Sequence, residues 1–342
     1  MALVYNVNNS ATQILAAKQI KENIFVNLLH RDGKGVSEHT ETNVSTLRII
    51  KPAVPTGAAR KLNESTNGGF FNSADADYQN ILEYDLNLLY IYDRMIDIPE
   101  VQEDMVPVNV FDAANKNIAG RISTEINAST LAEQLANRLN AADTANAWTD
   151  IAVVVGTGDK ATYDAVMDAS AMLDNGDEAN GIQAFPFEER ELIMRPSFRR
   201  QLMSQTGVIL GGSNFAQSMV AKGGLSPEDA KEFGNMYCGE IDLVPCYICP
   251  NPIWNRAGEW IDSDTALNDV EAVMVAASAT DRGISTVDYV KIIDSPSGAG
   301  KRLQPKTRWG INVCYGKGIV PIVKNGASVP AAQLTVMAPA SR

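Results

Sequence analysis

The segment Gly156–Ala161, with glycines at its first and third positions, is the part of the chain most similar to a known ligand-binding motif. It follows a strand-like apolar run and opens a predicted helix, as in the turn that holds the pyrophosphate of a dinucleotide. Asp159 and Asp164, however, bring negative charge to where phosphate would bind. Asp174 and Asp177 have roughly the spacing of a ribose contact, but they fall in a loop. A tight turn from strand to helix needs the same glycines, so a nucleotide-binding oxidoreductase is only an alternative reading.

The segment Ser295–Arg302, with the sequence SPSGAGKR, resembles a phosphate-binding P-loop only in its last glycine and Lys301. Ser295 stands where the first glycine of that motif belongs, and Arg302 stands where a serine or threonine would bind magnesium. We therefore predict no nucleotide site here and interpret the segment as a turn between two strands.

Four cysteines raise the question of a metal site. Cys246 and Cys249 have the CxxC spacing of zinc ligands, and Cys238 and Cys314 could complete a set of four thiolates. Zinc knuckles usually lie on glycine-containing turns and occur in pairs, whereas this CxxC lies in an alternating apolar stretch before Pro250. Buried thiols in a reducing compartment are the simpler interpretation, which we favour over zinc.

The remaining polar residues give little support for catalysis. The two histidines, His30 and His39, have no partner at a suitable spacing. The sequence therefore gives little support for a serine or cysteine nucleophile activated by a histidine. The acid pairs Glu188–Glu189 and Asp262–Asp264 fall in predicted turns and are expected to be solvated. Arg195–Arg200 could contact phosphate, but we expect a helix start that forms ion pairs between subunits. We predict no catalytic, cofactor-binding or metal-binding residue.

The chain of 342 residues has a formal net charge of −12, which is unevenly distributed. The first 61 residues contain 8 Lys and Arg against 4 Asp and Glu, and the remaining 281 contain 21 against 37. An acidic body argues against a surface that grips nucleic acid, since phosphate contacts need clustered basic side chains. No apolar run is long enough for a membrane span, and a signal peptide is not evident. We expect a protein that is cytosolic when made.

The first of the elements around these residues are two segments predicted to be extended strands. Thr46–Pro52 and Tyr78–Ile98 have strand-like patterns, and Ala53–Asp77 between them lacks periodicity. Because such a long loop is unusual inside a compact domain, the pattern predicts a projecting hairpin. Before it, a polar stretch at 31–43 is expected to connect the hairpin to an amphipathic segment. The apolar residues of that segment that recur at helical spacing are Ile14, Leu15, Ile20, Ile24, Leu28 and Leu29.

Pro107–Leu139 is the longest predicted helix. Its apolar residues lie mostly four apart, with one change of phase at Asn127–Ser129. Thirty residues would span roughly 45 Å, longer than a round core needs, so we expect the helix to brace an extended subunit. A bend at the change of phase would instead make two ordinary helices.

The rest of the chain is mixed α/β and then rich in strands. Residues 162–175 (TYDAVMDASAMLDN) predict a helix, and residues 191–203 (ELIMRPSFRRQLM) predict a strand followed by a helix. Residues 234–251 (GNMYCGEIDLVPCYICPN) predict a hairpin. Residues 308–323 (RWGINVCYGKGIVPIV) predict closing strands.

The order of these parts resembles the major capsid protein of tailed bacteriophages, that is, the Hong Kong ninety-seven capsid fold, which encapsulins share. The resemblance implies an α+β fold with an N-terminal arm at 1–44 and an extended hairpin loop at 45–98. It further implies a peripheral domain with a spine helix at 99–147 and 263–342, and an axial domain at 148–262.

In function, the resemblance implies a shell subunit that forms hexamers and pentamers around packaged double-stranded DNA, with no enzymatic activity and no cofactor. It implies a scaffolding protein and a portal as partners, non-specific contact with DNA, and no membrane, and it leaves open whether a decoration protein binds. The resemblance also implies assembly in the host cytoplasm and a final location in the virion. An encapsulin-like compartment is the alternative role. Some members of the family crosslink the hairpin covalently through a lysine. We do not assign that role to Lys61, because no motif around it matches.

Overall fold

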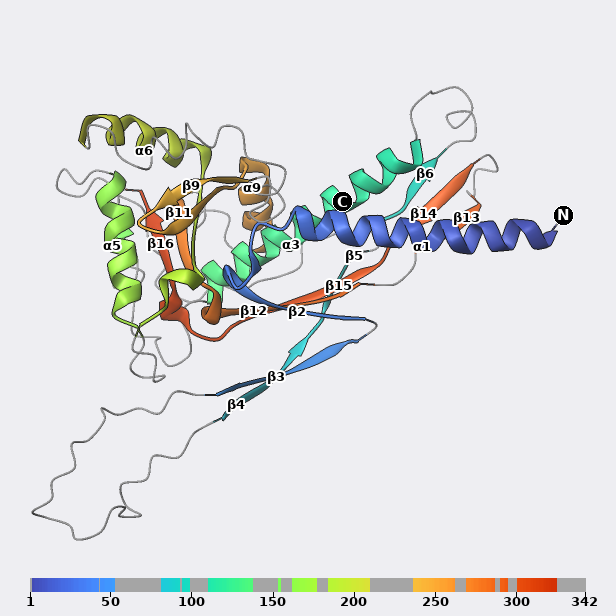
Figure 1. Cartoon of the computed structure of the whole chain (residues 1–342), viewed down its shortest axis with the longest axis horizontal. Helices are drawn as coiled ribbons and strands as arrows, with labels where there is room; N and C mark the ends of the chain where they lie inside the picture. Colours follow the sequence, from blue (N-terminus) through green and yellow to red (C-terminus); the bar gives the residue numbers. More distant parts are fainter. Residues whose placement is uncertain are drawn as a thin grey trace, which may run out of the picture.

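Figure 1 presents the structure, a computed structural model of the whole chain. The structure describes residues 2–42, 44–52, 81–92, 94–98, 110–137, 153–154, 162–176, 184–209, 236–261, 269–286, 290–294 and 300–324, to which the following statements refer. Helices and strands are interspersed along the chain, which confirms the predicted α+β class.

The largest sheet has six strands in the order β7-β16-β11-β8-β10-β9. The helices α5 (Thr162–Asp174) and α6 (Pro196–Ile209) contact β11. All residues of β8, β11 and β16 are buried, as expected for strands with both faces covered. The strands are β7 (Val153–Val154), β8 (Arg190–Met194), β9 (Tyr237–Ile241), β10 (Val244–Ile248), β11 (Val270–Ala276) and β16 (Ile319–Val323).

The hairpin predicted at 234–251 is formed by β9 and β10. Its turn residues Asp242 and Leu243 have φ values of 50° and 65°. Positive φ at both central residues is the turn geometry that fits the twist of two paired strands. The helix α9 (Asn251–Trp260) follows directly and packs against the long helix α3.

The second sheet has five strands in the order β1-β2-β12-β15-β5. The polar stretch predicted to be a connection at 31–43 instead contains β2, which pairs in parallel with β12. The prediction was wrong because the polar side chains of β2 meet charged partners on β12 rather than an apolar core. The strands are β1 (Arg31–Asp32), β2 (Gly35–Thr42), β5 (Tyr90–Tyr92), β12 (Thr280–Thr286) and β15 (Thr307–Val313).

Two short connections carry the chain between these sheets. The turn η6 (Ala277–Ala279) joins β11 to β12, and η7 (Gly316–Gly318) joins β15 to β16. The amide of Cys314 donates to the carbonyl of Ala279 at 2.8 Å, so the connections are tied to each other. A third sheet contains β13 (Lys291–Asp294), β14 (Lys301–Gln304) and β6 (Ile96–Ile98).

The long helix α3 (Val110–Asn137) contains 28 residues, or about 42 Å of helix. It is a single helix through the change of phase at which we considered a bend. The polar residues there are buried and form hydrogen bonds. Ser129 and Thr130 donate to the carbonyl of Ile126, and Asn127 donates to a backbone oxygen of the chain that follows α1. The apolar pattern shifts because this face meets polar partners.

The first helix, α1 (Ala2–Val26), packs along α3 and extends past the body in Figure 1. Its buried face contains Ile20 and Ile24 as predicted, together with two alanines, Ala16 and Ala17. Ile14 and Leu15, which the sequence pattern assigned to the same stripe, are 64% and 57% exposed. The prediction was wrong for these two because spacings of three and four residues back from Ile20 lead to Ala17 and Ala16, which places Ile14 and Leu15 on other sides of the helix.

The strands β3 (Thr46–Pro52) and β4 (Ile81–Asn87) pair antiparallel and project from the body (Figure 1). The predicted loop Ala53–Asp77 between them lies outside the described residues. A small apolar cluster at the base of β3 and β4 is separate from the main core; its buried members are Leu47, Ile49, Leu86 and Leu88.

The hairpin base rests on two glycines that face each other across β12 and β15. Gly283 and Gly310 are register partners. A Cβ at Gly310 would lie 2.2 Å from the backbone oxygen of Asn87, whereas one at Gly283 would meet only the ends of leucine side chains. The backbone of the hairpin can approach the sheet this closely only because Gly310 has no side chain.

We expect Gly310→Ala to destabilise the protein by about 1–3 kcal/mol, since it forces a backbone shift. Gly120→Ala is the matched control. Apart from the adjacent residues and the nearby backbone of α3, no atom of the described residues lies within 4 Å of the added methyl group, so Gly120→Ala should stabilise by roughly 0.5–1 kcal/mol. Urea unfolding measures both. Equal effects of the two substitutions would contradict the role of Gly310.

Candidate functional site

Two polar junctions attach the arm and the hairpin to the body, and both begin at consecutive residues of β12. We call the contacts of Arg282 with His30, Glu38 and Thr130 the arm junction, and the contacts around Asp281 the hairpin junction. Successive side chains of a strand point to opposite faces of its sheet. One strand therefore holds the arm on one face and the hairpin on the other.

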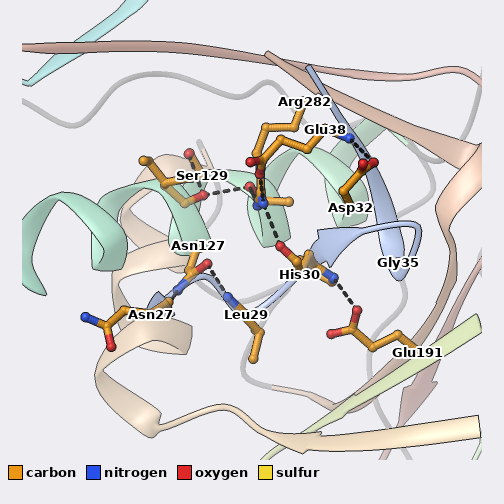
Figure 2. A network of polar contacts seen from close by, with 12 residues as sticks. Asn27, Leu29, His30, Asp32, Gly35, Glu38, Asn127, Ser129, Glu191 and Arg282 are labelled. Carbon is orange, nitrogen blue, oxygen red and sulfur yellow. Dashed lines mark hydrogen bonds and ion pairs between the residues drawn. The ribbon is translucent and has the colours of Figure 1, made fainter. Parts of the chain in front are cut away.

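In the arm junction, Arg282 is fully buried and its donors have partners. Its guanidinium donates to the backbone oxygen of His30 at 2.6 Å, to Thr130 Oγ1 at 3.4 Å and to the carboxylate of Glu38. Figure 2 shows Arg282 above the turn that contains His30 and Gly35. A buried guanidinium is tolerated only when it is paired and hydrogen-bonded in this way.

Asn127 of α3 fixes the chain where it leaves α1. Its Oδ1 accepts from the amide of Leu29 at 2.9 Å, and its Nδ2 donates to the backbone oxygen of Asn27 at 3.1 Å (Figure 2). A single side chain thus replaces the helical hydrogen bonds that end with α1. The chain that follows α1 is held in one register along α3.

The third contact of the arm is His30 with Glu191 of β8. His30 Nδ1 and Glu191 Oε2 lie 3.3 Å apart, and both side chains are completely buried. Burial raises the pKa of Glu191, although His30, Arg282 and Lys34 act to lower it. Gly35 has a φ of 62°, and a Cβ there would lie 2.6 Å from both groups. No sequence spacing predicts this pair, whose members are 161 residues apart.

In the hairpin junction, four side chains converge on the buried carboxylate of Asp281. Lys51 Nζ lies 2.6 Å from Oδ2, Cys314 Sγ donates to Oδ2 at 3.0 Å, and His39 Nε2 lies 3.2 Å from Oδ1. Tyr84 of β4 donates its hydroxyl to the same carboxylate. Both strands of the hairpin are therefore tied to one residue of β12.

The protonation of this junction is set by the same contacts. Burial acts to raise the pKa of Asp281, but hydrogen bonds from Cys314, Lys51 and Tyr84 outweigh it and hold the pKa below its ordinary value of 3.8. Burial, followed by the charge of Asp281, raises the pKa of Cys314 to about 12. Burial also raises the pKa of Tyr84. These groups bind one another as protonated donors and a charged acceptor, which is a structural arrangement.

A groove of about 410 Å³ lies beside the hairpin junction. It is bounded by the turn between β1 and β2, by the end of β3 and by the segment that precedes β8. Its lining residues are Asp32, Gly33, Ser37, Lys51, Ala184, Pro186, Glu189, Ala277, Ser278 and Tyr315.

The cysteines do not gather. Cys314 belongs to the hairpin junction, whereas Cys238 and Cys246 lie on β9 and β10 of another sheet. Cys246 and Cys249 are buried, and burial raises their pKa values. In the part of the chain that the structure describes, no group of three His, Cys, Asp or Glu residues could hold a metal ion.

The residues of the nucleotide motifs have other partners or lie outside the described residues. Asp174 pairs with Arg190 at 2.6 Å. Lys301 and Arg302 lie in the strand β14, and Arg302 pairs with Asp97. Arg195, expected to form ion pairs between subunits, donates to the backbone oxygen of Val270 and stacks on a tryptophan of the same chain. Outside the described residues lie Gly156–Ala161, Asp177, Asp262, Asp264 and Ser295.

Comparison with known proteins relates the chain to phage capsids through its fold. No family model and no curated protein matches the sequence. The solved capsid of Ralstonia phage GP4 matches 86% of this chain and 89% of its own, with a TM-score of 0.56 and 9% identity. The capsid of Helicobacter pylori bacteriophage KHP30 matches 88% and 90%, with a TM-score of 0.56 and 11% identity.

The mature capsid of bacteriophage PhiM1 matches 85% of this chain and 86% of its own, with a TM-score of 0.52 and 9% identity. The chain thus has the fold of the capsid chains of phages, which confirms the resemblance inferred from the order of its elements. Within the described residues, no helix combines the length and the apolar character that a membrane crossing requires.

We expect Arg282→Met to destabilise the protein by roughly 3–5 kcal/mol, because it leaves Glu38 charged and buried without its partner. Arg302→Met removes a guanidinium from a partly exposed pair with Asp97 and should change stability little. Urea midpoints compare the two variants. A similar loss of stability in both variants would show that burial of the ion pair does not determine how much its removal destabilises the protein.

The low pKa of Asp281 predicts a stability that depends on pH. A carboxylate with a depressed pKa stabilises the fold above its ordinary pKa of 3.8, and this contribution is lost as the pH falls through the lower value in the fold. Asp281→Asn should lower stability at pH 7 by about 2 kcal/mol. The difference from the wild type should shrink below pH 3.8. A difference that stays constant from pH 7 to pH 2.5 would contradict this assignment.

Proposed function

We propose that the chain is the major capsid protein of a tailed double-stranded DNA bacteriophage. It forms hexamers and pentamers of an icosahedral shell that encloses the genome. The observation that supports this proposal is the fold shared with phage capsid chains over more than four-fifths of the length. The extended parts of the molecule suit the same role, because a closed shell needs contacts repeated around symmetry axes.

The parts of the subunit are assigned by the same proposal. Residues 1–44 are the N-terminal arm, and residues 45–98 are the extended hairpin loop. The peripheral domain contains 99–147 with the spine helix, and 263–342. The axial domain is 148–262. The arm and hairpin junctions then hold the two extended parts at fixed angles to the body, so that they present the same surfaces in every copy.

The proposed partners follow from the shell. A separate scaffolding protein and a portal take part in assembly in the host cytoplasm, and a decoration protein is an optional partner of the finished particle. The packaged DNA is contacted without sequence specificity. A net charge of −12 suits a wall along which DNA must pack without adhering.

Two other functions fit less well. An encapsulin-like compartment shares the fold, but the solved structures described above are all phage capsids, which favours the viral shell. An oxidoreductase would use Gly156–Ala161 with an acidic residue for the ribose. Asp174, one of the two candidates for that contact, is instead paired with Arg190.

The proposal predicts that the purified chain, alone or with its scaffolding protein, forms closed particles visible by negative-stain electron microscopy. Deletion of residues 58–72 should leave a soluble, folded subunit that assembles poorly, since it shortens the hairpin without touching either junction. Circular dichroism serves as the folding control. A wild-type chain that stays monomeric under all conditions, or a deletion variant that forms normal shells, would contradict the proposal.

A further inference from the structure

The pair formed by His30 and Glu191 is sealed inside the subunit with two polar atoms unpartnered. Both side chains are completely buried, and Nδ1 of His30 lies 3.3 Å from Oε2 of Glu191 (Figure 2). Among the described residues, no hydrogen-bond partner reaches Nε2 of His30 or Oε1 of Glu191. The carboxyl group of Glu191 therefore depends on a single hydrogen bond, whereas a buried carboxylate is well accommodated only with several donors.

The turn between β1 and β2 closes over this contact. A Cβ at Gly35 would lie 2.6 Å from both Oε2 of Glu191 and Nδ1 of His30, so a larger residue does not fit there. The backbone oxygen of Gly35 accepts from Gln134 of α3 at 3.4 Å, and Gln134 carries no charge. Neither the turn nor α3 thus supplies a further donor to the carboxyl group among the described residues.

Two cations near Glu191 do not replace the missing hydrogen bonds. Arg282 of β12 donates to Glu38 and to the backbone oxygen of His30, and Lys34 donates to a backbone oxygen of the segment before β8 at 2.7 Å. Their charges act on Glu191 without contact. Burial raises the pKa of Glu191 and outweighs the opposite effects of His30, Arg282 and Lys34.

The titratable groups that face Glu191 from β10 are neutral. Cys246 and Tyr247 lie in that strand, and Cys249 follows it. Burial is the main cause that raises the pKa of each of the three, so they keep their protons. They supply no positive charge that would balance an ionised Glu191.

The protonation of the pair therefore determines how firmly it holds. In the neutral pair, one hydrogen lies between Nδ1 and Oε2, and burial costs little. When the pair loses a proton, a net negative charge remains in a buried place with one hydrogen bond. The other two contacts of this segment, from Arg282 and Asn127, do not change in the same way, because a guanidinium stays protonated and an amide does not ionise.

We propose that the His30–Glu191 pair is a proton-controlled latch between the chain that follows α1 and β8, which holds while the pair is neutral and loosens when rising pH removes a proton. A glutamate with a raised pKa binds its proton more tightly in the fold than in the unfolded chain. The free energy of unfolding therefore falls as the pH rises from the ordinary value of 4.5 through the raised value. This latch goes beyond the proposed function and does not depend on it.

The test compares the wild type with Glu191→Gln, which cannot ionise, and uses Glu188→Gln, at an exposed position, as the matched control. Hydrogen exchange of peptides that cover residues 27–36 in the whole chain, corrected for the intrinsic pH dependence of exchange, measures the latch. Peptides from β15 are the internal reference. From about pH 5 to about pH 9, the wild type and Glu188→Gln should lose protection at 27–36 relative to β15, and Glu191→Gln should keep it.

Two results would overturn the latch: a wild type whose protection at 27–36 does not change with pH, or the same pH dependence in Glu191→Gln. If Glu191→Gln fails to fold, Lys34→Gln decides the question, because it keeps both members of the pair and removes a charge that lowers the pKa of Glu191. The loss of protection should then move to higher pH, and an unchanged pH would overturn the latch. These measurements need no particles, so their failure leaves the proposed function unaffected, and a chain that forms no shells still tests the latch.

Discussion

Side chains alternate between the two faces of the sheet along β12, and this alternation places the two polar junctions on opposite sides of one strand. Asp281 and Arg282 are adjacent, so they must point to opposite faces of the five-stranded sheet. Arg282 reaches the arm and the spine helix, and Asp281 reaches both strands of the hairpin. A shift of one residue in the register of β12 would exchange the two charges and leave both buried groups without partners.

Within the described residues, the hairpin buries a small apolar cluster of its own. The apolar cluster at its base is separate from the main core. The paired glycines Gly283 and Gly310 let its backbone lie against the sheet. The hairpin junction then supplies directional contacts, which fix an angle better than apolar packing does. In the proposed shell, the extended parts of each copy need such contacts, because a small error in angle is magnified at their ends.

Buried charges are a poor source of stability, because removing them from water offsets much of their attraction. Their value in this subunit is geometric. The arm junction, Asn127 and the His30–Glu191 pair together link the chain that follows α1 to β12, α3 and β8, and a different placement of these elements would break those contacts. The proposed role, in which every copy presents the same surfaces, gives a physical reason to prefer one arrangement to a larger margin of stability.

Regular apolar patterns were enough to predict the long helix α3, the strand β3, the β9–β10 hairpin and the closing strands in their order. That order in turn predicted the capsid fold. The sequence by itself did not determine the strand β2, the continuity of α3 at Asn127–Ser129 or the junction residues. Each of those depends on partners that the fold brings together, such as His30 with Glu191 and Lys51 with Asp281. A local apolar pattern indicates which side of a helix or strand is buried. Polar pairs between distant segments, in contrast, form only when the sheets bring those segments together.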